Sequence, residues 1–393
     1  MIKNLHIIIF SRLMSFDGGR ETWLNQFLPE LHKQSKGEIN IFVYFYSDCN
    51  SIGSNLIEAA RDRDYSFVNI ALRPPGGIVN SFFRIVKFNS QVIRQICKEK
   101  TSNKSLILGI GSFHEGLVPF LFSIKLFRKS NTTTGIWLRS ILVKQLGAIG
   151  GKFYVKLVTL FERIQVRSVD HVISNGWDTQ EFYKSNYNID STVIPNAVRL
   201  ERFENIQGIK STDDCLKISF IGRLSMEKGF KTFVDAILSF NRDYENIKNK
   251  ITFEIVGDGP LKSYLLDRMS SNINYKSELK NSEIPNYLES IHCGVALTSA
   301  SLVGGGGVSN GFLEILAAGR LVIAWDNLIY RQVGECNSII YVEENSVNYL
   351  SNAFADLYIN RSKYLGLGVN GRFLSERFSL DAHVDKFSTA FLK

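Results

Sequence analysis

Arg223 and Lys228 stand close together in the segment KISFIGRLSMEKGFKTFVDAI, and each has a glycine beside it. A guanidinium is a planar fork of N–H donors and an ammonium is a compact point charge, so the pair suits a diphosphate. A departing nucleoside diphosphate needs such cations because negative charge develops on it. The segment therefore predicts a diphosphate site at the start of a helix, with two solvated surface cations as the alternative.

The segment GGGGVSNGFLEILAAGRLVIAW begins with four consecutive glycines, residues 304–307, and continues into a short helix that Ser309 can cap. Glu314 then lies about one turn inside the helix, where its carboxylate can accept hydrogen bonds from both hydroxyls of a ribose. The amides near Asn310 and Gly311 would face a phosphate at the helix amino terminus. A favourable position of Glu314 in the helix dipole is the alternative explanation.

Two segments in the first half also follow strand-like runs. His114 lies in GSFHEGL, where an imidazole with a usual pKa of about 6.5 can bond a sugar hydroxyl or carry a proton. Gly18 and Gly19 precede a helix that opens near Arg20, and their amides suit an anion such as a phosphate. A loop histidine satisfied by the backbone and a plain turn are the respective alternatives. Because the glycines do not form a Gly-x-Gly-x-x-Gly pattern, dinucleotide binding is not indicated.

Metal binding is not indicated either. Asp62 and Asp64 have the Asp-x-Asp spacing of some metal-binding transferases, but they follow the helical pattern LIEAAR rather than a strand end. The five cysteines lie dozens of residues apart, with no histidine at ligand spacing. We therefore predict no metal site and no bound cofactor, and reduced thiols of the kind found in the cytosol.

The scaffold that would gather these segments is predicted by the rest of the chain. Short apolar runs alternate with helical stretches, which is the pattern of parallel sheets covered on both faces. We predict strands at 5–10, 39–45, 105–110, 133–138 and 171–175, and then at 215–222, 251–257, 293–299 and 320–325. The fold class is therefore α/β, with two doubly wound units in series and a hinge at VIPNAV (193–198). Ligands of such sheets bind at the carboxyl ends of strands, where the candidate residues lie.

Composition excludes several other classes of protein. The chain has 393 residues, of which 45% are hydrophobic and 21% charged, so it is an ordinary folded protein with room for two domains. It contains no uninterrupted apolar stretch long enough to span a membrane. Its amino terminus, MIKNLHIIIFSRL, predicts a buried strand rather than a signal peptide, and we expect a cytoplasmic location.

The net charge of +8 is concentrated in the first half of the chain. Residues 1–200 carry 25 basic and 15 acidic side chains, whereas residues 201–393 carry 21 and 23. Aromatic residues are interleaved with the bases in SFFRIVKFNSQVIRQICKEK and LVPFLFSIKLFRKS. An anionic substrate, an anionic membrane surface, a nucleic acid or merely a solvated amphipathic helix could explain this pattern. Nucleic acid is not expected because no module that binds it is recognisable.

Six motifs, in order along the chain, resemble the two-domain GT-B glycosyltransferases, specifically glycosyltransferase family 4 (group 1). They are Gly18-Gly19-Arg20-Glu21, VRSVDHVISN, VIPNAV, FIGRLSMEKGF, FEIVGDGPLKSYL and SNGFLEILAAGRLVIA. The resemblance implies two Rossmann-like domains facing across a cleft, with acceptor bound by residues 1–197 and donor by residues 198–376. It also implies that a carboxyl-terminal helix, about residues 377–393, packs back on the first domain.

The resemblance further implies a retaining, metal-independent transfer from a nucleotide-diphosphate sugar, with UDP or GDP as the expected nucleotide. The acceptor would be a glycan or lipid-linked glycan of a bacterial surface polysaccharide, handled at the inner face of the cell membrane. By this similarity the catalytic residues would be His114, Arg223 and Lys228. The donor-binding residues would be Gly18, Gly19, Asn310, Gly311, Phe312 and Glu314, with Glu314 on the ribose.

Two positions depart from the family pattern. A second glutamate usually stands eight residues before the ribose one and contacts the donor sugar, but Gly306 occupies that position. A loop histidine usually follows the strand at TTTGIW, where Arg139 is found instead and could meet an anionic acceptor. The alternative functions are a nucleotide-sugar epimerase, a sugar-phosphate-utilising GT-B enzyme, or a binding subunit that has lost catalysis, which Gly306 permits.

Overall fold

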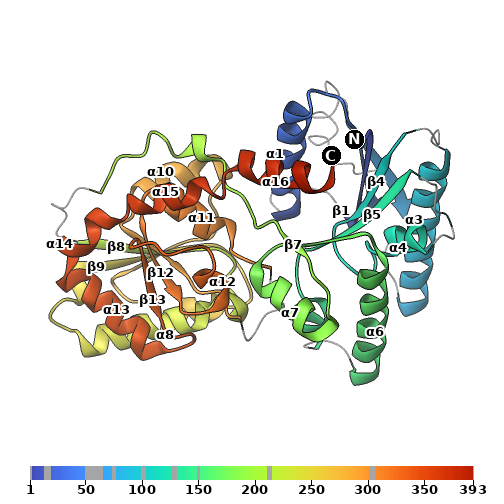
Figure 1. Cartoon of the computed structure of the whole chain (residues 1–393). Coiled ribbons are helices and arrows are strands. Elements are labelled where there is room, and N and C mark those ends of the chain that lie inside the picture. The colour runs from blue at the N-terminus through green and yellow to red at the C-terminus, as the bar shows by residue number, and fades with distance from the viewer. Residues whose placement is uncertain are drawn as a thin grey trace. The chain divides into compact units, whose positions relative to one another are not determined.

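A computed structural model describes residues 2–12, 19–48, 65–72, 77–98, 103–124, 127, 131–147, 151–209, 215–300 and 306–392. The chain divides into two compact units, each with its own sheet (Figure 1). The first unit comprises residues 1–194, 304–306 and 383–393, and the second comprises residues 195–303 and 307–382. The division falls inside VIPNAV, between Ile194 and Pro195, whereas the sequence-based boundary stands after residue 197.

The first unit is built on a parallel sheet with the strand order β3-β2-β1-β4-β5-β6-β7. Its strands are β1 (Asn4–Arg12), β2 (Asn40–Asp48), β3 (Tyr65–Leu72), β4 (Ser105–Gly109), β5 (Thr132–Leu138), β6 (His171–Ser174) and β7 (Thr192–Val193). The order reverses between β1 and β4, so the carboxyl ends of these strands form the crevice in which doubly wound sheets bind ligands.

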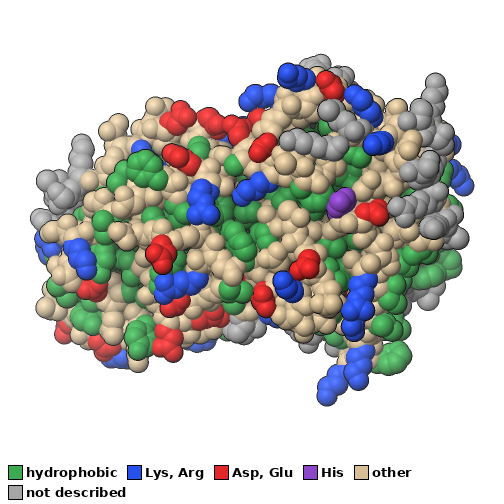
Figure 2. Space-filling view, viewed as in Figure 1, with side chains coloured by type: hydrophobic (Ala, Val, Ile, Leu, Met, Phe, Trp, Pro, Cys, Tyr) green, Lys and Arg blue, Asp and Glu red, His purple; other side chains and the backbone are tan. Residues whose placement is uncertain are grey.

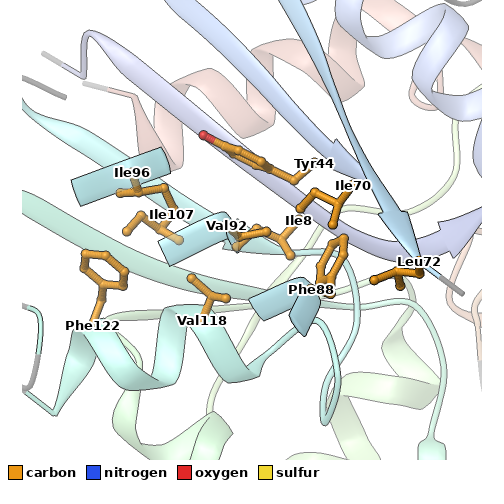
Figure 3. Close-up of a cluster of buried hydrophobic side chains, with 10 residues drawn as sticks. All are labelled: Ile8, Tyr44, Ile70, Leu72, Phe88, Val92, Ile96, Ile107, Val118 and Phe122. Carbon is orange, nitrogen blue, oxygen red and sulfur yellow. The ribbon is translucent and has the colours of Figure 1, made fainter. Parts of the chain in front are cut away.

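Helices cover both faces of this sheet. They are α1 (Gly19–Gln34), α3 (Gly77–Lys98), α4 (Leu117–Ser123), α5 (Leu142–Gly147), α6 (Lys152–Ser168), α7 (Trp177–Tyr187) and α16 (Leu380–Phe391). On one face, Phe88 of α3 packs in a buried cluster with Ile8 of β1 (Figure 3). On the other face, Trp137 of β5 stacks on Phe387 of α16. Burial on both faces is typical of parallel sheets and explains the continuous apolar runs in their strands.

The second unit has a parallel sheet with the order β10-β9-β8-β11-β12-β13. Its strands are β8 (Leu216–Ile221), β9 (Ile251–Val256), β10 (Ile273–Lys276), β11 (Cys293–Ala296), β12 (Leu321–Trp325) and β13 (Ile339–Val342). Its helices are α8 (Phe230–Asp243), α9 (Lys262–Leu266), α10 (Ile284–Glu289), α11 (Asn310–Ala317), α12 (Leu328–Arg331), α13 (Val347–Ile359), α14 (Arg361–Tyr364) and α15 (Asn370–Glu376). Here the order reverses between β8 and β11, which gives the unit its own crevice.

Each strand predicted from the sequence is present, and the α/β prediction of two doubly wound sheets is confirmed. The sequence pattern did not reveal β3, β7, β10 and β13. Three of these are very short, with two residues in β7 and four in each of β10 and β13. β3 is an edge strand in which buried, half-buried and exposed residues follow one another without a regular period.

The predictions about membrane helices, metal sites and cysteines can be compared only with the described residues. No helix among the described residues is long and apolar enough to cross a membrane. Within the same residues, no group of three or more His, Cys, Asp and Glu side chains could hold a metal ion. Asp62 and Asp64 lie outside the described residues. The described cysteines are free thiols, with Cys293 buried and Cys97 exposed.

Candidate functional site

The second unit gathers the predicted donor residues at the carboxyl ends of β8 and β11. After β8, the chain passes through Gly222 and a 3₁₀ turn, η2 (Met226–Lys228), into α8. Gly229 precedes α8 in the left-handed region at φ +67°, and a Cβ atom there would collide with the main-chain carbonyl of Leu297. Only glycine therefore allows this turn to lie so close to the segment that follows β11.

Lys228 lies where these two strand ends meet. Its Nζ is 3.4 Å from Oγ1 of Thr298, which follows β11. The ammonium is half-buried, and no described carboxylate lies within salt-bridge distance of it. Burial lowers the pKa of Lys228, and the neighbouring charge of Glu227 opposes that shift. A half-buried cation without an ion-pair partner can bind an anion, which would raise its pKa again.

Arg223 and Ser225 flank an anchored residue, Leu224. The N–H of Leu224 donates to the carbonyl of Asp258 at 3.0 Å, and its own carbonyl accepts from Leu261 N–H at 2.9 Å. Arg223 is exposed and makes no hydrogen bond or ion pair with a described residue. Ser225 is buried, and its Oγ has no partner in the described part of the chain. The backbone of the turn is fixed, while a guanidinium remains available to a ligand.

The amino terminus of α11 lies beside the same strand end. Ser309 caps it as predicted, since its Oγ accepts from Phe312 N–H at 3.3 Å. A Cβ atom on Gly311 would lie 3.7 Å from the carbonyl oxygen of Ile221, the last residue of β8. The N–H groups of Asn310 and Gly311 belong to the first turn, where helical amides lack acceptors within the helix. These amides can therefore receive an anion at the end of β8.

Phe312 is predicted to bind the donor together with Asn310 and Gly311, but its side chain is buried. Its side chain is 1% exposed and packs against Tyr330, with the ring centroids 5.2 Å apart. Its N–H is engaged by the capping serine. The structure thus gives Phe312 a packing role that orients α11, and its place in the family motif is explained by the core rather than by an exposed contact surface.

The loop before α11 is held by the segment that begins the second unit. Asn196 of VIPNAV donates from Nδ2 to the carbonyl of Val308 at 2.8 Å. Val308 is buried and immediately precedes the capping serine. The Pro-Asn segment, which the sequence suggested only as a hinge, therefore also fixes the start of α11.

Glu314 projects from α11 into an ion pair that the sequence did not reveal. Its Oε1 accepts from Nη1 of Arg202 at 2.9 Å, and the two side chains are only 14% and 19% exposed. Arg202 also donates to Oδ1 of Asn281 at 2.6 Å. Burial raises the pKa of Glu314, and the charge of Arg202 opposes that shift. Because Oε2 has no described partner, an oriented carboxylate oxygen remains for a hydroxyl donor such as ribose.

The first unit places His114 at its own crevice, in the loop between β4 and α4. The imidazole packs against the rings of Phe10 in β1 and Phe113, at centroid distances of 5.1 and 4.6 Å. Burial lowers the pKa of His114 to about 4, so the ring is neutral near pH 7 and can donate or accept a hydrogen bond without carrying charge. Of the two predicted glycines, Gly19 is the first residue of α1 and Gly18 lies outside the described residues.

Helix α6 holds the His114 loop in place. Ser112 donates from Oγ to Oε1 of Glu162 at 2.5 Å. The side chain of Gln165 accepts from the N–H of Phe113 at 2.7 Å and donates to its carbonyl at 2.8 Å. These bonds maintain Phe113 at φ +60°, a left-handed conformation that is uncommon for a bulky residue. Glu162 and Gln165 are thus positioning residues that no sequence motif indicates.

The lowered pKa of His114 predicts a specific pH dependence of stability. The usual value of 6.5 applies to the unfolded chain and about 4 to the folded one, so between them the unfolded state binds more protons. Stability should therefore be fully present above pH 6.5 and fall as the pH is lowered towards 4. The difference in melting temperature between the wild type and His114→Gln, measured across this range, isolates the effect. An equal pH dependence in both proteins would contradict the assignment.

The two departures from the family pattern are occupied by well-fitted residues. Gly306, which belongs to the first unit, has φ +121°, and a Cβ atom on it would lie 3.3 Å from the carbonyl oxygen of Arg139. Its N–H donates to Oγ1 of Thr179 at 3.3 Å, and its carbonyl accepts from Nδ2 of Asn175. The backbone at position 306 therefore suits glycine and not a glutamate. Arg139 lies over the ring of Trp23, 5.2 Å from its centroid.

The sequence of the second unit matches a known family. Residues 216–360 match the family described as glycosyl transferases group 1. They contain the turn after β8, the segment after β11 and α11, so the match covers the cationic turn, the capped helix and Glu314. No curated protein sequence matches the chain significantly.

The whole chain resembles solved structures of similar length. Sucrose-phosphate synthase from Thermosynechococcus elongatus has a TM-score of 0.71 at 15% identity, with 99% of this chain and 98% of that chain covered. HepE from Anabaena, solved with UDP and glucose, has a TM-score of 0.69 at 13% identity, with 100% of both chains covered. The apo form of WaaB, a lipopolysaccharide outer core galactosyltransferase, has a TM-score of 0.71 at 14% identity, with 100% and 99% covered. The chain therefore has the fold of these solved GT-B structures, and its residues 216–360 form a glycosyl transferases group 1 domain.

Proposed function

We propose that this chain transfers a sugar from a nucleotide-diphosphate sugar to a glycan or lipid-linked glycan, with retention of anomeric configuration and without a metal ion. The observation that carries the proposal is the position of Lys228. Its half-buried ammonium lies at the reversal point of the second sheet, beside Thr298, and has no described carboxylate partner. Such a cation can neutralise a diphosphate both before and after the glycosidic bond breaks.

The donor would be held by groups that lie around one strand end. Lys228 and the exposed Arg223 would bind the diphosphate, and the free amides of Asn310 and Gly311 would add donors at the helix terminus. Oε2 of Glu314 would accept from the ribose, while Arg202 prevents that carboxylate from turning away. This arrangement binds the nucleotide through its diphosphate and ribose, which are common to all nucleotide-diphosphate sugars.

In the proposed reaction, the bond between the anomeric carbon and the diphosphate oxygen breaks as the acceptor oxygen attacks on the same face. The acceptor proton passes to the departing diphosphate, whose charge Lys228 and Arg223 stabilise. Retention and independence of metal rest on the resemblance to family 4. His114, being neutral, would hydrogen-bond the transferring sugar rather than supply a charge.

The nature of the donor and acceptor is proposed from the relatives. The solved complexes of HepE contain UDP, UDP with glucose, or UDP-glucose, which favours UDP as the nucleotide here. WaaB acts in the lipopolysaccharide outer core, which favours a bacterial surface polysaccharide as the product. We propose that the enzyme works on the cytoplasmic side of the cell membrane, in peripheral contact with the bilayer that carries its acceptor.

A thermal-shift panel tests the donor site directly. UDP, GDP, ADP, TDP and CMP are each added at saturation, with a chelator, to the wild type and to Glu314→Gln. A ligand at about 100 times its dissociation constant adds about 2.7 kcal/mol of stability, so one nucleoside diphosphate should raise the melting temperature by several degrees. Glu314→Gln should weaken its binding about tenfold or more, because hydrogen bonds to charged groups are the strong ones.

The matched control is Glu343→Gln, which removes an exposed carboxylate of the same unit. It should bind the nucleotide as the wild type does. If no nucleoside diphosphate stabilises the wild type, the donor-site proposal fails and a binding subunit becomes the better explanation. If Glu314→Gln binds with unchanged affinity, Glu314 serves only the ion pair with Arg202.

A further inference from the structure

Helix α6 exposes a stripe of large apolar side chains. Phe153, Leu157, Leu160 and Ile164 are 81%, 53%, 61% and 44% exposed. Their spacing places them on one face of the helix, opposite the buried Glu162 that faces the protein. An apolar face of this kind ordinarily packs against a core, so its exposure marks an interaction surface. We call these four residues the α6 stripe.

Neighbouring helices of the same unit also expose apolar side chains. Phe82 and Phe83 of α3 are each 62% exposed, and Ile124 at the end of α4 is 46% exposed. α4 contacts both α3 and α6, so the three helices follow one another over the same face of the sheet. The exposed apolar area therefore extends beyond one helix.

The exposed charges of α6 and of the helices α3, α4 and α5 are all of one sign. Glu162 is the single acidic residue within α3, α4, α5 and α6, and it is buried. The exposed charged residues of α6 are Lys152, Lys156, Arg163 and Arg167. Figure 2 shows hydrophobic and basic side chains side by side over the part of the surface where Figure 1 draws α6. The outer face of α6 thus combines apolar side chains with positive charge.

We propose that the α6 stripe and its flanking bases are a docking surface for an anionic lipid bilayer. Aromatic and aliphatic side chains of a helix that lies in the membrane plane enter the boundary between head groups and acyl chains. Lysine and arginine at its border meet the negative surface potential of anionic lipids. Both components are present here on one helix face.

The charge pattern favours a bilayer over a second copy of this chain. A symmetric dimer through the α6 stripe would bring the same patch together from both copies and place like charges opposite one another. A nucleic acid would match the bases but would gain little from a stripe of Leu and Ile side chains. An anionic bilayer complements both the charge and the apolar character.

The position of the surface also fits the proposed function, on which this part of the inference rests. The inner side of α6 holds the His114 loop through Glu162 and Gln165. One helix therefore has its outer face towards the lipid and its inner face on the loop proposed to contact the transferring sugar. A lipid-linked acceptor would be presented beside the unit that has to bind it.

Co-sedimentation with vesicles tests the proposal. Vesicles of phosphatidylcholine, alone or mixed with phosphatidylglycerol, are incubated with the full chain in the absence of nucleotide. We expect binding to the mixed vesicles and little to the neutral ones, with the binding weakened by salt. Phe153→Ser/Leu160→Ser should lower the partition coefficient about tenfold or more through lost apolar contact. Lys152→Gln/Lys156→Gln should lower it about tenfold through lost charge.

Matched variants separate this surface from general hydrophobicity. Ile359→Ser and Phe373→Ser remove side chains of the second unit that are 62% and 67% exposed, as much as those of the α6 stripe. They should leave vesicle binding unchanged. Circular dichroism melting checks that each variant is folded. UDP binding, measured without vesicles, should be the same in all of them, whereas Glu314→Gln should lose UDP and keep the vesicles.

Four outcomes would overturn the proposal. The first is an absence of binding to anionic vesicles, and the second is equal binding to neutral ones. The third is an equal loss in the variants of the second unit. The fourth is a wild-type dimer in light scattering that Phe153→Ser/Leu160→Ser converts to monomer without changing vesicle binding, which would assign the surface to a second copy. If only UDP binding fails, the donor-site proposal is wrong and the lipid-surface proposal is unaffected.

Discussion

Lys228→Ala should lower kcat/KM for sugar transfer by about 100- to 1,000-fold, the range observed when a preorganised donor to developing negative charge is removed. The ammonium lies at the reversal point of the second sheet and has no described carboxylate to compete with a diphosphate. Its partner Thr298 is neutral and would remain in place. Because the interaction strengthens as the leaving group gains charge, kcat should fall more than the affinity for the nucleotide sugar.

Lys231→Ala is the matched control for this experiment. Lys231 lies three residues further along the chain, has a side chain that is 43% exposed, and pairs with Asp235 at 2.6 Å within α8. Its removal should change kcat/KM by no more than about twofold, since exposed helix pairs contribute little. Initial rates with a nucleotide sugar and a soluble acceptor give both numbers. Transfer by Lys228→Ala within a few-fold of the control would show that the diphosphate is held elsewhere.

Gly229 and Ser309 of the donor site could be predicted because each is recognisable from the residues next to it in the sequence. Gly229 is needed at a left-handed position next to a lysine, and Ser309 stands where a capping residue must stand. Gly229 follows the predicted strand that is β8, and Ser309 follows the predicted strand that is β11. Each of the two residues directly precedes the helix whose start it marks, so the local pattern contains the geometry.

The parts of the site that depend on distant partners could not be predicted. Arg202 and Glu314 are 112 residues apart, and no spacing rule connects an arginine in a short 3₁₀ turn to a carboxylate in a later helix. The bond from Asn196 to Val308 spans the same separation. Such contacts arise from how the sheet brings chain segments together. The glycine at position 306 was visible, but its φ of +121° is a property of the folded loop.

The sequence shows that the first half of the chain is basic, but it does not show where the basic side chains lie on the folded surface. Counting bases and aromatics leaves an anionic substrate, an anionic membrane surface and a solvated helix as explanations. The structure distinguishes them within α6 because Leu160 is exposed and Glu162 is buried, although the two are only two positions apart in the sequence. Burial of the single acidic residue leaves the outer face purely basic and apolar. Exposure, and not composition, therefore supplies the argument for a lipid partner.

Glu162 is the centre of a buried hydrogen-bond network in the first unit. Its Oε1 accepts from Ser112 and from Tyr183 at 2.6 Å, and its Oε2 accepts from Tyr187 at 3.2 Å. Burial raises its pKa, and the three hydroxyl donors oppose that shift. The carboxylate joins α6, α7 and the His114 loop, so its removal would disturb all three at once.

Glu162→Ala should therefore destabilise the first unit by about 3 kcal/mol or more, because three hydroxyls lose their acceptor and two of them are buried tyrosines. For a unit of this size the melting temperature should fall by about 6–12 °C. Glu162→Gln should be milder, since hydroxyls can donate to the amide oxygen or accept from its nitrogen. Glu181→Ala, on the exposed side of α7, is the matched control and should have little effect.

A second measurement separates positioning from general stability. In the folded Glu162→Ala protein, at a temperature well below its melting point, the His114 loop loses the bond from Ser112 and its imidazole should become more hydrated. The pKa of His114, followed by NMR, should then rise from about 4 towards 6.5, whereas in Glu181→Ala it should stay near 4. A destabilised Glu162→Ala protein with an unchanged His114 pKa would make Glu162 a structural residue of α6 alone. A melting temperature equal to that of the control would show that the hydrogen bonds of Glu162 do not stabilise the first unit.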